Sequence, residues 1–358
     1  LEVLYLHYYA LGLPHCWWER LNQVSLFSKY MVMKKIAAVS VAAFVALVSS
    51  AVASSTGVQF ESPTYALGPI HNQDGWSSAG AAGAGCAVYD HAVVSNTYGY
   101  ASLGAESRRM SNAVTSGCFG DQTFSKSLTD EAGEAAAQAD GMSGGTRQGH
   151  FEAQWDFAST VPGSEQPGLT VTASPDRGDG ARMSWIQMAD TPTGLAVNFY
   201  DYQDGAVEPA GTCVTGDNFV FTNVASGLDR TVPHTIKVTM DLVDGVNNDV
   251  VKVYVDGVLR HTGTSWEGYF NYCESNPTRT VDSILFRTGG AAVPATVGNG
   301  FVIDNLNLTS GPVLKAPANK NECKNVGWKS FNNPVFKNQG DCVSYVESST
   351  KAFGNKTK

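Results

Sequence analysis

The chain has few charged side chains and no apolar run long enough to cross a bilayer. Charged residues make up 16% of its 358 positions. The apolar run from Ile36 to Val48 has 13 residues, whereas a membrane-spanning helix needs about 20. No Cys-x-x-Cys pair and no Cys/His cluster with zinc spacing occurs, so the thiols are not predicted to bind a metal. No Gly-Lys-Ser/Thr occurs in the glycine-rich stretch 141–149, which excludes a phosphate-binding loop there.

Basic residues are scarce in most of the chain. Residues 54–312 hold 12 Lys and Arg against 28 Asp and Glu, a net charge of −16, whereas residues 313–358 hold 8 Lys against 3 acids, a net charge of +5. The boundary falls at Gly311-Pro312, and the Ala/Pro-rich stretch after it has the composition of a linker. The acidic part argues against a nucleic-acid partner. The basic tail has two explanations, which are contact with an anionic polymer and a few solvated lysines.

A basic head, an apolar run and a small-residue tail follow one another near the start of the chain. Two lysines precede the apolar run, and Ala51-Val-Ala53 follows it. This is the layout of a secretory signal peptide. We therefore expect residues 31–53 to be a signal peptide, the mature chain to begin at Ser54, and residues 1–30 to be upstream frame translated by mistake. The alternative is a single-pass anchor or a buried helix.

Export permits disulfides, and six cysteines lie beyond the expected signal peptide. They are Cys86, Cys118, Cys213, Cys273, Cys323 and Cys342. Their spacing favours bonds between neighbours in sequence, 86–118, 213–273 and 323–342, although six cysteines allow other connectivities. Oxidised thiols cannot act as nucleophiles. No cysteine is therefore predicted to be catalytic.

The acidic part has the alternating pattern of β-strands. In residues 150–158 four apolar side chains alternate with Glu152, Gln154 and Asp156. Further strands are expected at residues 168–173, 181–187, 195–202, 219–222, 235–242, 250–255, 283–287 and 301–308. Asp256-Gly257, between two such runs, is a hairpin signal. About 250 residues of short strands with period-two burial predict an all-β sandwich of two antiparallel sheets over residues 54–312.

Three stretches carry a resemblance to a known superfamily. Phe60-Glu-Ser62 and Gly75-Trp-Ser77 near the start, with "FVIDNL" at 301–306, resemble the frame of concanavalin A-like jelly rolls, and "VKVYVDGVLRHTG" at 251–263 is similar to the late hairpin of secreted bacterial members. The superfamily includes lectins, laminin-G-like domains, glucanases, polysaccharide lyases and carbohydrate-binding modules. The resemblance therefore implies a jelly-roll fold over roughly residues 57–310 and does not specify an activity.

Residues 313–358 resemble a different small unit. Two cysteines, Cys323 and Cys342, bracket a segment that contains Trp328 and two phenylalanines. This pattern is similar to a Cys-bracketed cap at the C-termini of exported bacterial proteins. We expect a linker and a small disulfide-stapled cap here.

Glycosidase chemistry needs a general acid and a second carboxylate at a defined separation. The glucanases of the superfamily carry them as Glu-x-Asp-x-x-Glu on one strand, and this string is absent here. The nearest pair, Glu152 and Asp156, would lie ~13 Å apart on an extended strand, beyond the roughly 6.5–9.5 Å of inverting enzymes. No catalytic residue is therefore predicted.

One polar and aromatic sheet face is the candidate binding site. If alternating apolar residues, Trp185 among them, fill the core, the opposite face carries Glu152, Asp156, Arg182, Asn198, Tyr200 and Tyr202. Arg182 and Tyr200 are then expected to be cross-strand neighbours, with Tyr202 at the rim. Such a face suits a sugar, which takes hydrogen bonds at its hydroxyls and an aromatic ring against its C–H face. The equal alternative is a solvated sheet surface with ordinary tyrosines.

An acid lies near each end of the acidic part, Glu61 at the start and Asp304 at the end. Many jelly rolls of the resembled type bind a structural Ca²⁺ between the first and last strands, so the resemblance implies that these two carboxylates belong to such a site. Ca²⁺ takes six to eight oxygen ligands, and two carboxylates would be part of the set. The alternative is that both are ordinary exposed acids.

Together these observations predict a secreted protein that binds an extracellular or envelope polysaccharide without chemistry and has no membrane span in its mature form. One alternative is a polysaccharide lyase or glycoside hydrolase of the same fold. Another is a structural matrix or surface-assembly protein, for which the Ala/Gly/Ser-rich stretch from Ser77 to Ala87 is the hint.

Overall fold

The computed structural model describes residues 54–78, 89–115, 122–126, 128, 149–176, 182–203, 219–243, 248–269, 281, 283–288, 290–312, 315–331 and 334–354. The expected leader, the expected signal peptide and four of the cysteines, at 86, 118, 213 and 273, lie outside these ranges. The corresponding processing and disulfides stay predictions. Within the ranges, no helix has the length and hydrophobicity of a membrane span.

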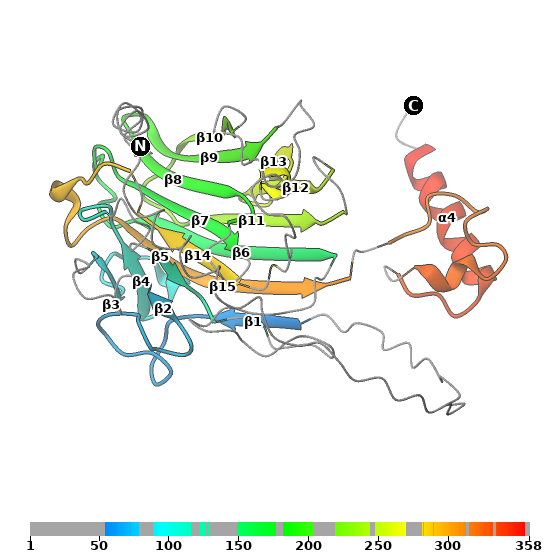
Figure 1. Ribbon diagram of the computed structural model, residues 1–358, viewed down its shortest axis with the longest axis horizontal. Coiled ribbons are helices and arrows are strands. Elements are labelled where there is room, and N and C mark those ends of the chain that lie inside the picture. The colour runs from blue at the N-terminus through cyan, green and yellow to red at the C-terminus, as the bar shows by residue number, and fades with distance from the viewer. Residues whose placement is uncertain are drawn as a thin grey trace, which may run out of the picture.

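Two antiparallel sheets form the large part of the molecule (Figure 1). Sheet A has the strand order β13 (Val258–Gly263), β12 (Val250–Val255), β11 (His234–Asp241), β6 (His150–Ser159), β15 (Phe301–Gly311), β4 (Glu106–Met110) and β3 (His91–Ser95), and β1 (Ser54–Val58) also pairs with β15. Sheet B has the order β10 (Phe219–Leu228), β9 (Gly194–Tyr202), β8 (Trp185–Thr191), β7 (Thr170–Asp176), β14 (Ser283–Arg287), β5 (Gln122–Phe124) and β2 (Ser77–Ser78). The predicted all-β jelly-roll sandwich is confirmed.

The strands follow from the local pattern of the sequence. On β6 the apolar residues of the alternating set are fully buried, whereas Glu152, Gln154 and Asp156 are half-buried. The turn between β12 and β13 places Asp256 at φ 52° and Gly257 at φ 74°. A two-residue hairpin turn of this kind needs positive φ at both positions, which Asp-Gly supplies.

The core lies between the two sheets and is rich in aromatic side chains. Its largest fully buried members include Trp76, Trp155, Phe157, Phe199 and Phe286. Trp155 of sheet A meets Phe286 of sheet B with ring centroids 6.0 Å apart and planes at 82°. This edge-to-face contact joins the two layers directly.

One arginine is buried in this core. Arg108 of β4 is 0% exposed, and its guanidinium carbon lies 4.7 Å from the ring centroid of Trp76 and 4.5 Å from that of Phe286. None of its side-chain nitrogens has a hydrogen-bond partner in the part of the chain that the structure describes. Burial lowers the pKa of Arg108 to about 9, so the group is still cationic at neutral pH and rests on two aromatic faces.

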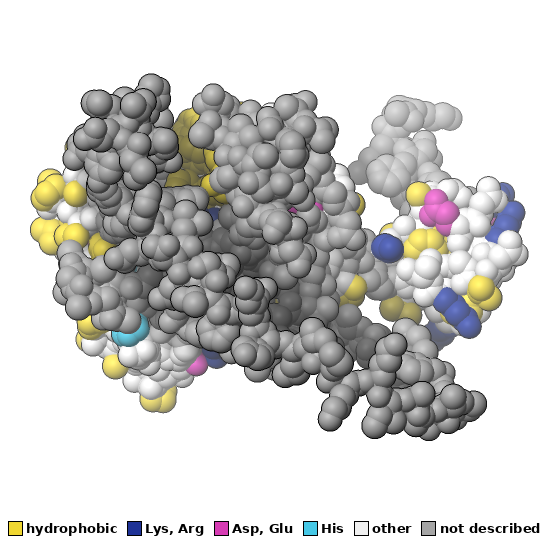
Figure 2. All heavy atoms as spheres, viewed as in Figure 1, with side chains coloured by type: hydrophobic (Ala, Val, Ile, Leu, Met, Phe, Trp, Pro, Cys, Tyr) yellow, Lys and Arg dark blue, Asp and Glu magenta, His cyan; other side chains and the backbone are white. Residues whose placement is uncertain are grey.

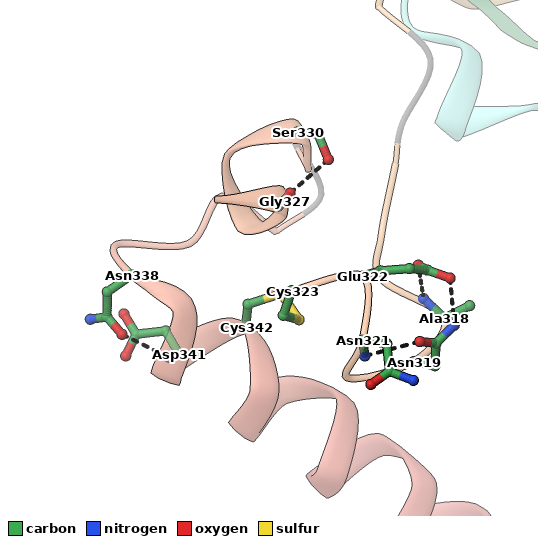
Figure 3. Close-up of a disulfide and its surroundings, with 10 residues drawn as sticks. All are labelled: Ala318, Asn319, Asn321, Glu322, Cys323, Gly327, Ser330, Asn338, Asp341 and Cys342. Atoms are coloured by element: carbon green, nitrogen blue, oxygen red, sulfur yellow. Dashed lines mark hydrogen bonds between the residues drawn. A yellow bond between two sulfur atoms is a disulfide. The ribbon is translucent and has the colours of Figure 1, made fainter. Parts of the chain in front are cut away.

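The C-terminal segment has its own small buried cluster. It contains the 3₁₀ turn η6 (Gly327–Ser330) and the helix α4 (Gln339–Gly354), and the expected Cys323–Cys342 disulfide is confirmed (Figure 3). The two half-cystines are buried with Phe336 and Val346. Asn338 caps the helix by accepting a hydrogen bond from the Asp341 amide at 3.0 Å. The domain boundary near residue 312 stays a prediction.

Candidate functional site

The expected binding residues are divided between the two sheets. Glu152 and Asp156 lie on β6 in sheet A, whereas Asn198, Tyr200 and Tyr202 lie on β9 in sheet B. The outward faces of two stacked sheets look in opposite directions, so the expectation of one shared face is wrong. Alternation shows which residues of a strand share a face, but it does not show which strands share a sheet.

The two sheet A acids make contacts within their own sheet. Glu152 pairs with Lys237 at 3.4 Å between Oε2 and Nζ. Asp156 accepts hydrogen bonds from the Thr235 hydroxyl at 2.5 Å and from Nδ2 of the Asn305 side chain at 2.8 Å. These contacts tie β6 to its neighbours β11 and β15.

The outward face of sheet B carries a row of polar residues that runs across β14, β7, β8, β9 and β10. The residues of the row are paired successively by strand register, and they are Arg287, Thr172, Gln187, Asn198 and Asn223. Residues that are directly opposite in antiparallel strands project on the same face. The row therefore forms one continuous polar line perpendicular to the strands.

The amides of this polar row form a hydrogen-bonded chain. Asn223 donates from Nδ2 to Oδ1 of Asn198 at 2.8 Å, and Asn198 donates from Nδ2 to Oε1 of Gln187 at 3.1 Å. The chain runs in one direction, with the Nε2 donors of Gln187 at one end and the Oδ1 acceptor of Asn223 at the other. The order of donors and acceptors along the row is therefore fixed, and Thr172, Asn198 and Arg287 within it are buried.

An aromatic row lies beside the polar row. Trp185, Tyr200 and Phe221 are paired across β8, β9 and β10, two residues along each strand from the amides. Their ring centroids are 6.1 Å and 4.9 Å apart, and Phe221 is 52% exposed. Burial raises the pKa of Tyr200, so its hydroxyl stays protonated at neutral pH and can both donate and accept. Neither row contains a carboxylate.

One end of the aromatic row is covered by residues 264–269. The Trp266 amide donates to the Met183 carbonyl at 2.8 Å, and its indole N–H donates to the Tyr200 carbonyl at 2.9 Å. The Trp266 ring lies 4.5 Å from that of Phe219. Tyr202 is 0% exposed beneath this cover, so its expected place at the rim is wrong. The cover comes from a segment more than 60 residues further along the chain, which no local pattern reveals.

Trp185, and not Arg182, lies opposite Tyr200. The strand β8 begins at Trp185, so the alternation expected from residue 181 onward does not extend through Arg182. The indole consequently faces outward and leaves the core to Ile186 and Met188, which corrects the expectation that Trp185 is a core residue. Arg182 and Arg287 hold their guanidinium carbons 5.4 Å and 5.6 Å from the centroid of the Trp185 ring. Both contacts are cation–π interactions.

Several residues of this face were not predicted as site residues: Thr172, Gln187, Phe221, Asn223 and Arg287. Phe221 lies within the strand expected at 219–222, whereas Asn223 lies one residue past its expected end, because β10 continues to Leu228. Whether Phe221 and Asn223 belong to the candidate site depends on the pairing of β10 with β9, which joins residues that are distant in sequence.

The two expected metal ligands are brought near one another. The pKa of Asp304 is raised to about 7, chiefly by burial and in addition by the charges of Glu61 and Asp156, whereas hydrogen bonds from Asn305 and Ser107 act to lower it. Asp304 is 1% exposed, so it is not an ordinary exposed acid. Glu61 accepts hydrogen bonds at Oε1 from the amides of residues 105 and 106, at 2.6 Å and 3.2 Å.

The oxygens around Glu61 and Asp304 would suit a hard cation only in part. Among the described residues, no group of three or more His, Cys, Asp and Glu side chains is arranged to hold a metal. Backbone carbonyls would therefore have to complete a Ca²⁺ shell. A Cβ at Gly104 would lie 1.9 Å from Oε1 of Glu61, so the main chain approaches this carboxylate closely.

Comparisons with known proteins found similar folds among solved structures only. No family model and no curated protein matches the chain. The alginate lyase Aly36B is 14% identical, with 71% of this chain and 96% of that chain covered and a TM-score of 0.38. An endo-1,3-beta-glucanase from Streptomyces sioyaensis is 13% identical, with 62% and 76% covered and a TM-score of 0.30.

A carbohydrate-binding module, CBM66 from Bacillus subtilis, is 11% identical, with 66% of this chain and 96% of that chain covered and a TM-score of 0.29. The chain also matches a sialidase, of which it spans 17%. These neighbours are carbohydrate-binding or carbohydrate-active proteins. The likeness is one of fold, and no residue's role is taken from it.

Proposed function

We propose that the protein is secreted and binds an extracellular or envelope polysaccharide on the outward face of sheet B, without chemistry. The observation that carries the proposal is the polar row of amides beside the aromatic row of Trp185, Tyr200 and Phe221. Sugars need ordered donors and acceptors for their hydroxyls and a ring surface for their C–H groups. The two rows supply both on rigid, paired strands.

Binding is favoured over hydrolysis by the chemistry of the two rows. Glycoside hydrolysis needs two carboxylates that flank the scissile bond, and the rows offer amides, a hydroxyl and a guanidinium in their place. The sheet A acids Glu152 and Asp156 belong to the opposite face and engage Lys237, Thr235 and Asn305. They are therefore not part of the proposed site.

Phe221→Ala should weaken glycan binding by about 1–3 kcal/mol, the range expected for an aromatic residue at the centre of a binding surface. The fold should be unaffected, because the ring is 52% exposed. Asn198→Ala should weaken binding too, since it breaks the amide chain in the middle. A glycan array would identify the ligand, and isothermal titration with that ligand would measure both effects.

Tyr254→Ala is the matched control, because Tyr254 is a half-buried aromatic residue on the outward face of sheet A. It should leave binding unchanged. If Tyr254→Ala lowers the affinity and Phe221→Ala does not, the binding face is assigned to the wrong sheet. If the protein releases reducing or unsaturated ends from any member of a polysaccharide panel, it is an enzyme and the proposal of binding without chemistry is wrong.

We also propose a structural Ca²⁺ at Glu61 and Asp304. The support is the raised pKa of the buried Asp304, because a divalent cation would offset both its burial and the repulsion from Glu61 and Asp156. If the cation binds only the folded state, a free cation concentration of 100 times the Kd would stabilise the folded state by about 2.7 kcal/mol. EDTA should then lower the Tm of the mature chain, and millimolar calcium should restore it.

Glu61→Gln and Asp304→Asn should each abolish this calcium-dependent shift in Tm. Glu152→Gln is the control, because this half-exposed acid of the same sheet pairs with Lys237, and it should keep the shift. Identical melting of the wild type in EDTA and in calcium would show that the site does not exist.

A further inference from the structure

We propose that the C-terminal segment, residues 313–358, is a second docking module that binds an acidic polysaccharide through its lysines. The first observation is the separation of charge along the chain. The segment carries a net charge of +5, whereas residues 54–312 carry −16. A polyanion is therefore repelled by the sandwich and attracted by the segment.

The lysines of the segment are available for a partner. Four of them, Lys320, Lys324, Lys329 and Lys337, are exposed and make no ion pair with any described residue. Figure 2 shows lysine side chains, in dark blue, at separate places on the surface of the C-terminal segment. Dispersed cations on a small rigid unit match the regularly repeated charges of an anionic polymer.

Two of the acids in the segment serve its own structure. Glu322 accepts hydrogen bonds from the Ala318 amide at 2.9 Å and from the Asn319 side chain at 2.6 Å (Figure 3). Asp341 lies in the first turn of α4, where a negative charge is favoured by the helix dipole. These carboxylates are held in turns and are not paired with the four lysines, so the positive charge of the surface is not cancelled locally.

The turn at residues 324–329 adds an apolar surface between basic side chains. Val326 is 65% exposed, Trp328 is half-buried, and Nζ of Lys329 lies 5.4 Å from the centroid of the Trp328 ring. A sugar that carries a carboxylate presents a charged group and a C–H face together. The combination of lysine and tryptophan fits both, which favours an acidic polysaccharide as the partner.

The segment is built to act apart from the sandwich. Its buried cluster consists of its own residues around the Cys323–Cys342 disulfide, and one stretch of chain joins it to β15 (Figure 1). Charges separated by more than the Debye length, about 10 Å at 0.1 M salt, are largely screened from one another. A tethered basic module can therefore hold a polyanion beside an acidic domain.

The test uses the full mature chain and polygalacturonate as the acidic probe, in affinity electrophoresis and biolayer interferometry. Binding should weaken roughly tenfold or more between 50 and 300 mM NaCl, because a few released counterions give this salt dependence. The triple variant Lys320→Glu, Lys324→Glu and Lys329→Glu should lose about tenfold or more at 50 mM NaCl. The corresponding triple Gln variant should lose less, and it guards against misfolding of the Glu variant.

The matched control carries the same change of charge on sheet A, as Lys237→Glu, Lys252→Glu and Arg260→Glu. It should bind polygalacturonate like the wild type if the segment is the binding surface. Equal losses in both triple variants would show that only net charge matters, and salt-insensitive binding would also overturn the proposal. Binding to phosphatidylglycerol vesicles but not to polygalacturonate would assign the surface to lipid instead.

The outcome is independent of the glycan face of sheet B. Phe221→Ala should leave polygalacturonate binding intact, and the lysine variants should leave intact the binding of any neutral glycan found for sheet B. Two separate modules would be supported if Phe221→Ala loses only the neutral-glycan binding and the lysine variants lose only the polygalacturonate binding. Loss of polygalacturonate binding in Phe221→Ala would place the acidic polymer on sheet B and refute the second module.

Discussion

Phe286→Ala should destabilise the protein more than Phe199→Ala, although both rings are fully buried in sheet B. Truncation of a buried phenylalanine costs about 3–5 kcal/mol because contacts are lost and a cavity is left. At Phe286 the lost ring also covers the Arg108 guanidinium at 4.5 Å and meets Trp155 at 6.0 Å. The cation would then face a cavity, so this variant should fall at the upper end of that range. Urea denaturation of both variants measures the difference.

Arg108→Met separates the packing of the ring from its contact with the cation. Replacement of a buried charge by an apolar side chain of similar volume is often neutral or stabilising, and we expect this result in the wild-type background. In the Phe286→Ala background the same change should recover part of the lost stability. A coupling free energy of about 0.5–3 kcal/mol is the usual size for residues in contact.

Two results would contradict this account of Arg108. The first is an equal cost for Phe286→Ala and Phe199→Ala. The second is strict additivity of Arg108→Met with Phe286→Ala. Either would mean that the guanidinium gains nothing from the ring beyond ordinary packing.

The strands from residue 150 onward were largely predictable because their signals are local, whereas β1 to β5 were not predicted. Residues 250–255 and 283–287 form strands with the predicted bounds. Asp256-Gly257 makes the predicted hairpin turn between β12 and β13. Alternation and turn chemistry act over a few residues and need no knowledge of the rest of the chain. The Cys323–Cys342 bond is a similar case, since its two ends are close in sequence.

The site was less predictable because it depends on which strands are neighbours. The strand with Glu152 and the strand with Asn198 have the same alternating pattern and belong to different sheets. Trp185 faces outward and not into the core, because β8 begins at that residue. Tyr202 is buried against Trp266, which is distant in sequence. The buried Arg108 had no signal at all, because its environment is made by Trp76 and Phe286 from separate parts of the chain.

The second large effect is expected at a buried ion pair on the edge of the sandwich. Asp90 accepts hydrogen bonds at Oδ2 from Arg109 at 2.8 Å, from the Ser111 hydroxyl at 2.5 Å and from the Gly298 amide at 2.8 Å. Arg109 also donates to the Asn299 carbonyl at 2.8 Å. The pair therefore ties the end of β4 to the loop that precedes β15.

Asp90→Asn should cost about 3–5 kcal/mol at neutral pH, because removal of one partner leaves a buried cation without compensation. The side chains of Asp90 and Arg109 are only 13% and 9% exposed. Glu152→Gln is the matched control, since its pair with Lys237 is about one-third exposed on each side. It should cost about 1 kcal/mol or less, the usual value for a surface ion pair.

The difference between wild type and Asp90→Asn should also depend on pH. Burial alone would raise the pKa of Asp90, but the hydrogen bonds from Arg109, Ser111 and Gly298 outweigh it and lower the pKa below its ordinary value. A lowered pKa means that the stabilisation is fully present above the ordinary value of about 4 and is lost as the pH falls through the lowered one. Urea unfolding at pH 7 and pH 3 should show the two proteins converging in acid. A gap that stays constant with pH would show that the Asp90 charge is not what stabilises this edge.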